Sequence, residues 1–523
     1  MHAITPTAAA DLVADGDTVV CAGFVGAGHA EAVTRAIETR FLARGSPRDL
    51  TLVYAAGQGD RGQRGVNHFG HAGLVRRIIG GHWISAPRLG ALVNADAVEA
   101  WNLPQGVIAQ LFRAIAGGKA GVVTSIGLHT FVDPRHDGAR LTPCTARSAL
   151  EPRVELITLQ GREQLFYPGL PLDVALIRAT TADERGNLST EEEPFHQDLL
   201  AIAQAARNSG GTVIAQVKRI VAAGTIDPNR VRVPGILVDH LVIADDPADH
   251  WMTFGEAFNP AYLASGPRPD PAAAPAIPLD CRKIIQRRAF LALRELAHPV
   301  VNFGVGMPAG IGPIAQEEGH HDYTVTVESG PVGGIPAQLL SFGASAFPEA
   351  VIDQASMFDF YDGGGLDIAF LGLAEFDGWG NVNVSRFGAR VAGVGGFVNI
   401  TQSARRVVFM GTLTADGLQV EARDGRLRIL QEGRVHKLVP QLQQLSFNGP
   451  YVASLGHSVR YVTERAVFEL RDGALTLCEI APGLDLGRDV LAACAMPVRV
   501  ADDLQTMDAR IFRDAPMRRQ SGP

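Results

Sequence analysis

Short apolar stretches rich in β-branched residues alternate along the chain with longer amphipathic stretches. In the first half, the apolar run VVCAGFVGAG at 19–28 leads through glycines into a helix-like segment at 31–45. In the second half, VVNFGVGMPAG at 300–310 leads in the same way into IGPIAQEEG at 311–319. Strands that alternate with helices are typical of βαβ units. The pattern therefore predicts an α/β fold whose sheets are open and mostly parallel.

The two halves of the chain also resemble each other. Residues 172–187, LDVALIRATTADERGN, align without gaps with LDIAFLGLAEFDGWGN at 366–381. Likewise, TLVYAAG at 51–57 aligns with TVTVESG at 324–330. A solenoid would show several short repeats at a fixed period, whereas this chain shows one long duplication. We therefore expect two duplicated open α/β domains that are fused in one chain.

A Pro/Ala-rich stretch separates the two halves. Residues 265–280, SGPRPDPAAAPAIPLD, cannot sustain a helix or a central strand, because proline removes a backbone donor. We expect this stretch to link an N-terminal domain at 1–264 to a C-terminal domain at 281–515. The last residues, 516–523, are expected to form a disordered tail.

Composition and charge narrow the class of protein. The 523 residues carry a formal net charge of −8, which disfavours broad nucleic-acid binding. The N-terminus, MHAITPTAAADLVADGD, is not typical of a signal peptide, and no apolar run reaches the ~20 residues of a membrane helix. The five cysteines are scattered, and no histidine or cysteine spacing matches a metal motif. We therefore expect a cytoplasmic protein that contacts no membrane and holds no metal.

The alignment of 51–57 with 324–330 singles out Glu328, because the first copy has Ala55 at that position. An ionisable residue at the carboxyl end of a parallel strand lies where open α/β sheets bind their ligands. Two glycine clusters, GVGMP at 304–308 and GVGGF at 393–397, bring backbone N–H groups within reach of such a ligand. A solvated carboxylate and ordinary tight turns explain the same residues without any chemistry.

A nucleotide site is a further alternative. The sequence GVGMPA at 304–309, followed about 20 residues later by Glu328, fits the outline of a dinucleotide-binding fingerprint. The first-half copy, GFVGAG at 23–28, leads instead to Ala55 and lacks the acidic residue. This asymmetry disfavours a nucleotide-binding module without catalytic activity.

Four long segments resemble the single-chain acyl-CoA:acetate and propionate CoA-transferases, a branch of the class I coenzyme A transferases. They are NLPQGVIAQLFRAIAGGKAGVVTSIGLHTFVDPR at 102–135, VTVESGPVGG at 325–334, GGLDIAFLGLAEFDGWGNVNVSRFG at 364–388 and GVGGFVNITQSARRVVFMGT at 393–412. The resemblance implies that the catalytic glutamate lies in the second half, where Glu328 matches it. It also implies transfer of CoA from a short-chain acyl-CoA to a carboxylate such as acetate. An acyl-CoA hydrolase on the same fold is the alternative.

The resemblance further implies how Glu328 reacts. It would form an acyl-glutamyl anhydride and then a glutamyl-CoA thioester. The Gln105 side chain and the backbone of Gly395 or Gly396 would form the oxyanion hole. Since the ordinary pKa of a glutamate is about 4.3, we expect Glu328 to be ionised at neutral pH without a general base.

The same resemblance implies where CoA binds. Three residues would line the approach of the CoA thiol arm: Val305, Gly306 and Met307. Three cations are candidates for holding the CoA phosphates, and a solvated surface charge is the alternative explanation of each: Arg113, Lys119 and Arg386. CoA enters as a substrate, so no tightly bound cofactor is expected, and a homo-oligomer is expected from the family.

Overall fold

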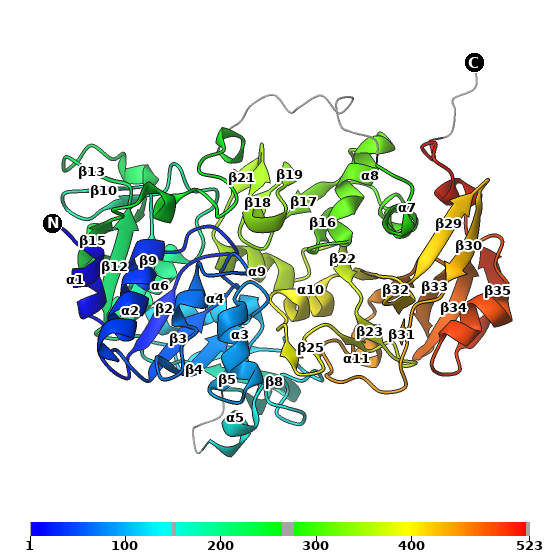
Figure 1. Cartoon of the computed structure of the whole chain (residues 1–523), viewed down its shortest axis with the longest axis horizontal. Helices are drawn as coiled ribbons and strands as arrows, with labels where there is room; N and C mark the ends of the chain where they lie inside the picture. The colour runs from blue at the N-terminus through cyan, green and yellow to red at the C-terminus, as the bar shows by residue number, and fades with distance from the viewer. Residues whose placement is uncertain (1, 149–152, 264–276, 519–523) are drawn as a thin grey trace. The chain divides into compact units, whose positions relative to one another are not determined.

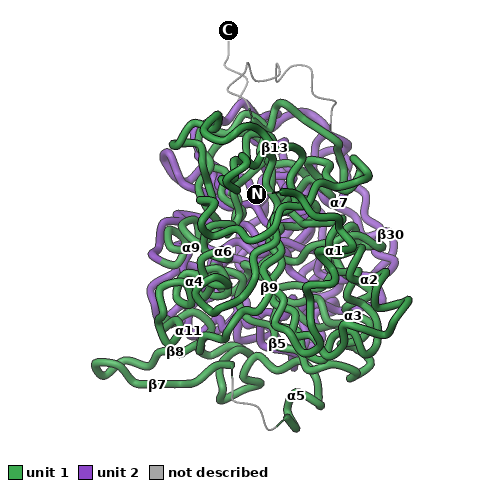
Figure 2. The backbone as a smooth tube through the Cα atoms, turned by 90° about the vertical axis from the view of Figure 1, so that its left-hand side faces the viewer, with its two compact units in different colours: residues 1–266, 327–362, 385–399 green, residues 267–326, 363–384, 400–523 purple. Residues whose placement is uncertain are grey.

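The computed structural model describes residues 2–148, 153–263 and 277–518, which fall into two compact units (Figure 2). Unit 1 consists of residues 1–266, 327–362 and 385–399. Unit 2 consists of residues 267–326, 363–384 and 400–523. The segment that contains Glu328 therefore packs with unit 1, whereas the predicted boundaries placed it in the C-terminal domain. Residues 265–276 of the predicted linker lie outside the described residues.

Unit 1 is built on an eight-stranded sheet in which every neighbouring pair of strands is parallel. In order across the sheet, its strands are β1 (Ala3–Ile4), β15 (His240–Ile243), β12 (Thr212–Val217), β9 (Val174–Arg178), β2 (Thr18–Cys21), β3 (Leu50–Tyr54), β4 (Val75–Gly80) and β5 (Glu99–Asn102). The central strand β9 reads VALIR and is buried throughout, as a parallel strand covered on both faces must be.

Seven helices are assigned within the described part of unit 1, and Figure 1 shows several of them beside the sheet. They are α1 (Pro6–Asp11), α2 (Glu31–Arg44), α3 (Pro87–Asn94), α4 (Gln105–Ala116), α5 (Pro143–Arg147), α6 (Leu199–Asn208) and α9 (Gln354–Asp362). The predicted helix at 31–45 is confirmed as α2, which ends where Gly45 takes a left-handed φ of 67°. Helix α4 packs against both α6 and α9.

Unit 2 contains most of a second sheet. In order, its strands are β17 (Thr324–Thr326), β16 (Val300–Phe303), β22 (Ile368–Gly372), β27 (Arg406–Met410), β32 (Ser458–Val462), β33 (Ala466–Arg471), β34 (Ala474–Ile480) and β35 (Arg499–Thr506). Neighbours from β17 to β32 pair in parallel, and β33 and β34 continue as antiparallel strands. The order β15-β12-β9-β2-β3 of unit 1 recurs here as β32-β27-β22-β16-β17, in agreement with the predicted duplication.

The core of unit 2 forms around helix α7 (Cys281–Leu293), with α8 (Ile311–Glu317) packed beside it. Phe290 and Leu293 on α7 are completely buried. The predicted disordered tail is wrong for its first residues, because Met517 is 1% exposed and its N–H donates to Glu318 Oε1 at 2.8 Å. Residues 519–523 lie outside the described residues.

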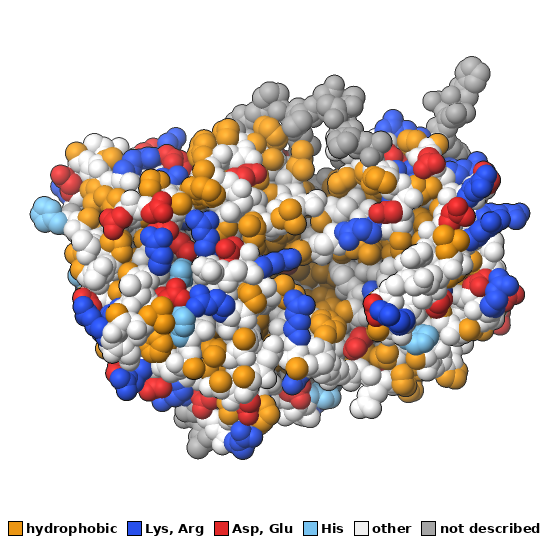
Figure 3. All heavy atoms as spheres, viewed as in Figure 1, with side chains coloured by type: hydrophobic (Ala, Val, Ile, Leu, Met, Phe, Trp, Pro, Cys, Tyr) orange, Lys and Arg blue, Asp and Glu red, His pale blue; other side chains and the backbone are white. Residues whose placement is uncertain are grey.

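Basic and acidic side chains are interspersed on the face of the protein in Figure 3, where no broad basic patch is visible. Among the helices described, none combines the length and the apolar character needed to cross a bilayer. In the described ranges, no three His, Cys, Asp or Glu side chains are arranged to hold a metal ion.

Candidate active site

Glu328 lies in a tight turn directly after strand β17. The N–H of Val327 donates to the Pro331 carbonyl oxygen, and the N–H of Gly330 donates to the Val327 carbonyl oxygen, each at 2.9 Å. Gly330 has a φ of +126°, and a Cβ built on it would lie 2.0 Å from the Ile352 carbonyl oxygen. Only glycine fits at that position. The turn therefore fixes the direction in which the chain presents Glu328.

The Glu328 side chain is partly exposed but is closely surrounded. A Cβ built on Gly396 would lie 3.0 Å from Glu328 Oε1 and 3.0 Å from Phe358 Cζ, so the carboxyl group lies close to both residues. Among the described residues, Glu328 has no hydrogen-bond partner. Burial raises its pKa to about 7. The expectation of a fully ionised Glu328 at neutral pH is therefore wrong for the free protein, because burial removes water that would stabilise the charge.

Gln105 is the first residue of α4 and is 3% exposed. Its backbone N–H donates to the Gly395 carbonyl oxygen at 2.9 Å, which brings the start of α4 to the glycine cluster. Its side-chain Nε2 is buried and has no hydrogen-bond partner among the described residues. Leaving a buried donor unpaired costs roughly 1–3 kcal/mol, so such a donor is a candidate for binding a ligand oxygen.

The two glycines proposed for the oxyanion hole differ in what their N–H groups do. The Gly395 N–H donates to the Gly81 carbonyl oxygen at 2.7 Å and is therefore occupied. The Gly396 N–H has no partner within the described part of the chain. The geometry thus leaves the Gly396 N–H, rather than that of Gly395, available to a ligand near Glu328.

A side-chain network that the sequence did not reveal joins helix α4 to helix α10 (Phe397–Ser403) and to the end of helix α9. Asn399 Oδ1 accepts from the Gly106 N–H at 3.2 Å, and Asn399 Nδ2 donates to the Asp362 carboxylate at 2.9 and 3.1 Å. Gln110 Nε2 donates to the same carboxylate at 2.8 Å. A Cβ on Gly106 would lie 2.4 Å from Phe358 Cδ1, so only glycine allows this helix contact. Asn399 and Asp362 carry no motif, and no spacing in the sequence could have identified them.

The residues predicted to meet the CoA thiol arm lie in unit 2, on the turn after β16. Val305 is 58% exposed, and Gly306 has a φ of +88° with open space where a Cβ would lie. Met307 packs against the core, and its carbonyl oxygen accepts from Gln286 Nε2 at 3.0 Å. The turn therefore exposes Val305 and Gly306 while Met307 anchors it to the core. Such an arrangement suits contact with a ligand.

The three candidate phosphate ligands have different surroundings. Arg113 forms an ion pair with Asp359, so its charge is partly neutralised. Lys119 is exposed, and with Arg113 it borders a cavity of about 650 Å³ beside α4. Arg386 Nη1 donates to the Leu141 carbonyl oxygen at 3.4 Å. Nothing in these contacts selects one of the three as a phosphate ligand.

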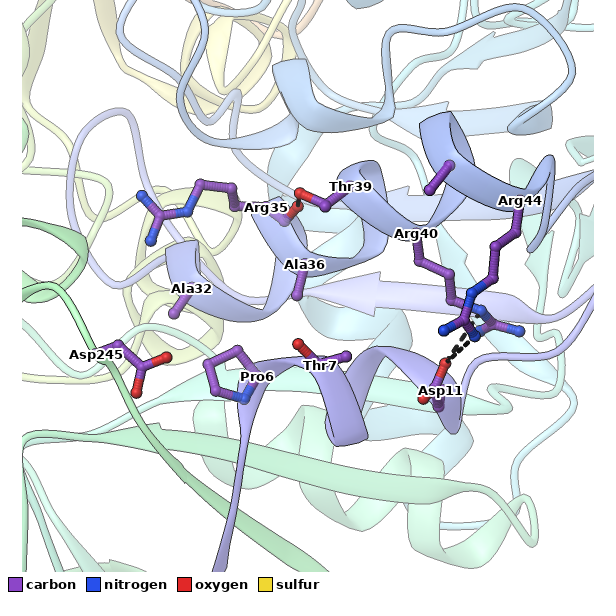
Figure 4. A pocket seen from close by; sticks show the side chains of 11 residues that line it. Pro6, Thr7, Asp11, Ala32, Arg35, Ala36, Thr39, Arg40, Arg44 and Asp245 are labelled. Carbon is purple, nitrogen blue, oxygen red and sulfur yellow. Dashed lines mark hydrogen bonds and ion pairs between the residues drawn. The ribbon is translucent and has the colours of Figure 1, made fainter.

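A smaller cavity of about 280 Å³ lies between α1 and α2 (Figure 4). Arg40 and Arg44 both reach Asp11 there, and Arg35 pairs with Asp249. Three of its arginines are thus paired with carboxylates of the protein. The region around Glu328, which combines an unpaired carboxyl group with unpaired donors, is the better candidate for catalysis.

Comparison with known proteins identifies the family of the chain. A family model for coenzyme A transferase matches residues 4–244. The caffeate CoA-transferase of Acetobacterium woodii is 44% identical over 517 residues, which cover 98% of this chain and 97% of that protein. Acetate CoA-transferase YdiF of Escherichia coli (strain K12) is 40% identical over 504 residues, covering 96% and 93% of the two chains.

Solved structures extend the comparison to the fold. The apoenzyme of acyl-CoA transferase YdiF from Escherichia coli O157:H7 matches with a TM-score of 0.92 at 38% identity, over 98% of this chain and 96% of that one. A structure of the same protein as a thioester complex with CoA matches with a TM-score of 0.91 at 38% identity, over the same shares of the two chains. The chain therefore belongs to the class I coenzyme A transferases of the single-chain type, and it is an enzyme that transfers CoA between an acyl-CoA and a carboxylate.

Proposed function

We propose that Glu328 carries CoA covalently in a two-stage transfer. In the first stage, a Glu328 carboxylate oxygen attacks the acyl-CoA carbonyl carbon, and the C–S bond breaks to give an acyl-glutamyl anhydride and CoA thiolate. The thiolate then attacks the glutamyl carbonyl carbon. The first carboxylate leaves, and a glutamyl-CoA thioester remains on the enzyme.

The second stage runs the same two steps in reverse. The acceptor carboxylate attacks the glutamyl-CoA carbonyl carbon, which gives a new anhydride and CoA thiolate. The thiolate attacks the acyl carbonyl carbon of that anhydride, so that the new acyl-CoA leaves and the Glu328 carboxylate is regenerated. Since every intermediate stays activated, no step needs an external energy source, but water must be kept from both intermediates.

Each addition places negative charge on a carbonyl oxygen, and two donors are proposed to stabilise it. They are Gln105 Nε2 and the Gly396 N–H, both without partners among the described residues. A donor already fixed in a site with little water contributes about 3–4 kcal/mol to such a transition state. The proposal rests on these unsatisfied donors and on the position of Gly396 beside the Glu328 carboxyl group.

The proposed substrates are a short-chain acyl-CoA and a carboxylate such as acetate. The relative named acetate CoA-transferase supports acetate, and the one named caffeate CoA-transferase makes a larger, aromatic acid the second candidate acceptor. Val305, Gly306 and Met307 are proposed to contact the thiol arm of CoA. Acceptor choice is tested by measuring kcat/KM for acetate, propionate and caffeate with one acyl-CoA donor.

The covalent step is tested by intact mass measurement after mixing the enzyme with acetyl-CoA in the absence of an acceptor. We expect a CoA-sized adduct that maps to the Glu328 peptide and is released by acetate. Glu328→Ala should form no adduct and lose at least about 10⁴-fold in activity, because the nucleophile is absent. Glu155→Ala, which removes an exposed glutamate on strand β7 (Glu155–Leu159), should behave like wild type. Steady CoA release without acceptor and without adduct would instead identify a hydrolase.

A further inference from the structure

The backbone that holds Gln105 occurs a second time in unit 1. Helix α9 also begins with a glutamine, Gln354, just as α4 begins with Gln105. The N–H of Gln354 donates to the Gln197 carbonyl oxygen at 3.3 Å, as the N–H of Gln105 donates to that of Gly395 at 2.9 Å. The two accepting residues have nearly the same left-handed backbone, with φ of +54° at Gln197 and +53° at Gly395.

This match defines a counterpart site that consists of Gln197, Asp198 and Gln354. Ala55 takes the place of Glu328 in the aligned strands, so the counterpart has no nucleophile. Gln197 and Asp198 stand before α6 where Gly395 and Gly396 stand before α10 (Phe397–Ser403). Since a left-handed conformation is unfavourable for a residue with a side chain, the arrangement at Gln197 indicates a backbone that the fold imposes.

The two sites differ in the hydrogen-bond partner of the glutamine side-chain amide. In the active site, Gln105 Nε2 has no partner among the described residues. In the counterpart site, Gln354 Nε2 donates to Asp198 Oδ2 at 2.8 Å. The amide that corresponds to the proposed oxyanion donor is thus already bound to a carboxylate of the protein itself.

The Asp198 side chain faces the Gln354 amide and does not cap helix α6. An aspartate before a helix normally accepts from the first N–H groups of that helix. Asp198 occupies that position before α6, but its side chain makes no such capping bond. Its carboxylate accepts instead from Gln354 Nε2 and from the backbone N–H of Ala355 in α9.

The counterpart site is closed to solvent. Gln354 is 1% exposed, Gln197 is 3% exposed and Asp198 is 6% exposed. Both amide atoms of Gln197 and the Oδ1 atom of Asp198 are buried without partners in the described part of the chain. A Cβ built on Gly28 would lie 1.2 Å from Gln197 Nε2, so the loop after β2 presses directly on this side chain. Burial, with Asp353 nearby, raises the pKa of Asp198 to about 7.

We propose that the counterpart site is a small carboxylate-binding site that the protein fills with its own Asp198. The ligand class is a monocarboxylate of the size of acetate or formate, held by Gln354 Nε2. Removing the side chain should create a cavity in which a free carboxylate takes the place of the missing group. The deleted atoms define the size: Asp198→Gly removes a fragment equivalent to acetate, and Asp198→Ala removes one equivalent to formate.

The test is the thermal midpoint of each variant in acetate, formate and chloride at equal ionic strength. Asp198→Gly should be less stable than wild type in chloride and should gain about 2–5 °C in saturating acetate, beyond any shift of wild type. Asp198→Ala should respond to formate more than to acetate. The readout is stability, so it does not depend on the chemistry at Glu328.

The decisive control is the double variant Asp198→Gly/Gln354→Ala, which lacks the donor but keeps the cavity. The double variant should lose the rise in thermal midpoint that acetate gives to Asp198→Gly. It should keep any shift in thermal midpoint that comes from acetate binding at the active site. Equal shifts in wild type, single and double variants would overturn the proposal. If Asp198→Gly does not fold in chloride, refolding yield is compared in the two salts, and a yield that acetate does not raise overturns it as well.

Discussion

The active site and the counterpart site share a backbone but treat their donors in opposite ways. In the counterpart, Gln354 is paired with Asp198, and the protein contains both partners. In the active site, Gln105 Nε2 is unpaired among the described residues, and the carboxyl group of Glu328 is partly desolvated. The two arrangements differ at three positions, because Gly395, Gly396 and Glu328 correspond to Gln197, Asp198 and Ala55 in the counterpart.

The difference concerns which buried groups are left unpaired in each site. An unpaired buried donor costs roughly 1–3 kcal/mol, and a desolvated carboxyl group adds to that cost. Functional sites commonly retain such unfavourable features, which the rest of the fold must offset. The counterpart site bears a cost as well, because both amide atoms of Gln197 and Asp198 Oδ1 are buried without partners in the described part of the chain.

Replacing Gln105 or Gln354 with alanine should produce the largest difference in kcat between the two sites. Gln105→Ala should lower kcat by about 10²–10³-fold, because it removes a donor to the transition state. Gln354→Ala should leave kcat within a few-fold of wild type but lower the free energy of unfolding by about 1–3 kcal/mol, because Asp198 loses its partner. Steady-state kinetics and denaturant titration of both variants check this. Similar kinetic losses in the two variants would show that the sites are not functionally distinct.

The two glycines before α10 should respond differently to an added methyl group. In Gly396→Ala the new Cβ lies 3.0 Å from Glu328 Oε1, so the carboxylate must shift, and kcat should fall by about 10–100-fold. In Gly395→Ala the Cβ lies 3.5 Å from Gln105 Oε1, which is ordinary contact. That variant should mainly lose about 1–2 kcal/mol of stability from its left-handed φ. Kinetics and unfolding curves of the pair separate the effects, and the reverse pattern would contradict the assignment of Gly396.

The pH dependence of Glu328 should produce the smallest effect. Its pKa of about 7 lies above the ordinary value of 4.5, so the unfolded chain ionises first as the pH rises. Folding stability is therefore lost between these two values and stays lower above them. Glu328→Gln should match wild type below pH 4.5 and be more stable above pH 7, by about 1–2 kcal/mol.

The same group sets the expected pH profile of the wild-type enzyme. Because the ionised form attacks, kcat/KM should rise with pH up to about 7 and then level off. Unfolding curves at several pH values check the stability effect, and initial rates check the profile. A rate that does not change between pH 5 and 8 would mean that Glu328 is already ionised in the free enzyme.

Much of the architecture was predictable from local pattern. The alternation of apolar runs with helical stretches predicted the parallel sheets, and the confirmed helix α2 begins and ends where the glycines imply. Alignment of the two halves singled out Glu328, because it is ionisable whereas the aligned residue Ala55 is apolar. The inferences about the fold are confirmed because strand and helix periodicity depend on neighbours that are close in the chain.

What the sequence determined by itself is thus the class of fold and the duplication, and it also singled out Glu328 as the candidate for the reactive carboxyl group. Only the tertiary structure decided that Gly396 rather than Gly395 has an available N–H, that Asn399 joins Gly106 to Asp362, and that Gln354 already holds Asp198. It also decided the raised pKa of Glu328. The physical reason is the same for each of them. Hydrogen-bond pairing and desolvation depend on groups up to several hundred residues away in the chain, and no local pattern records which of these groups the fold brings together.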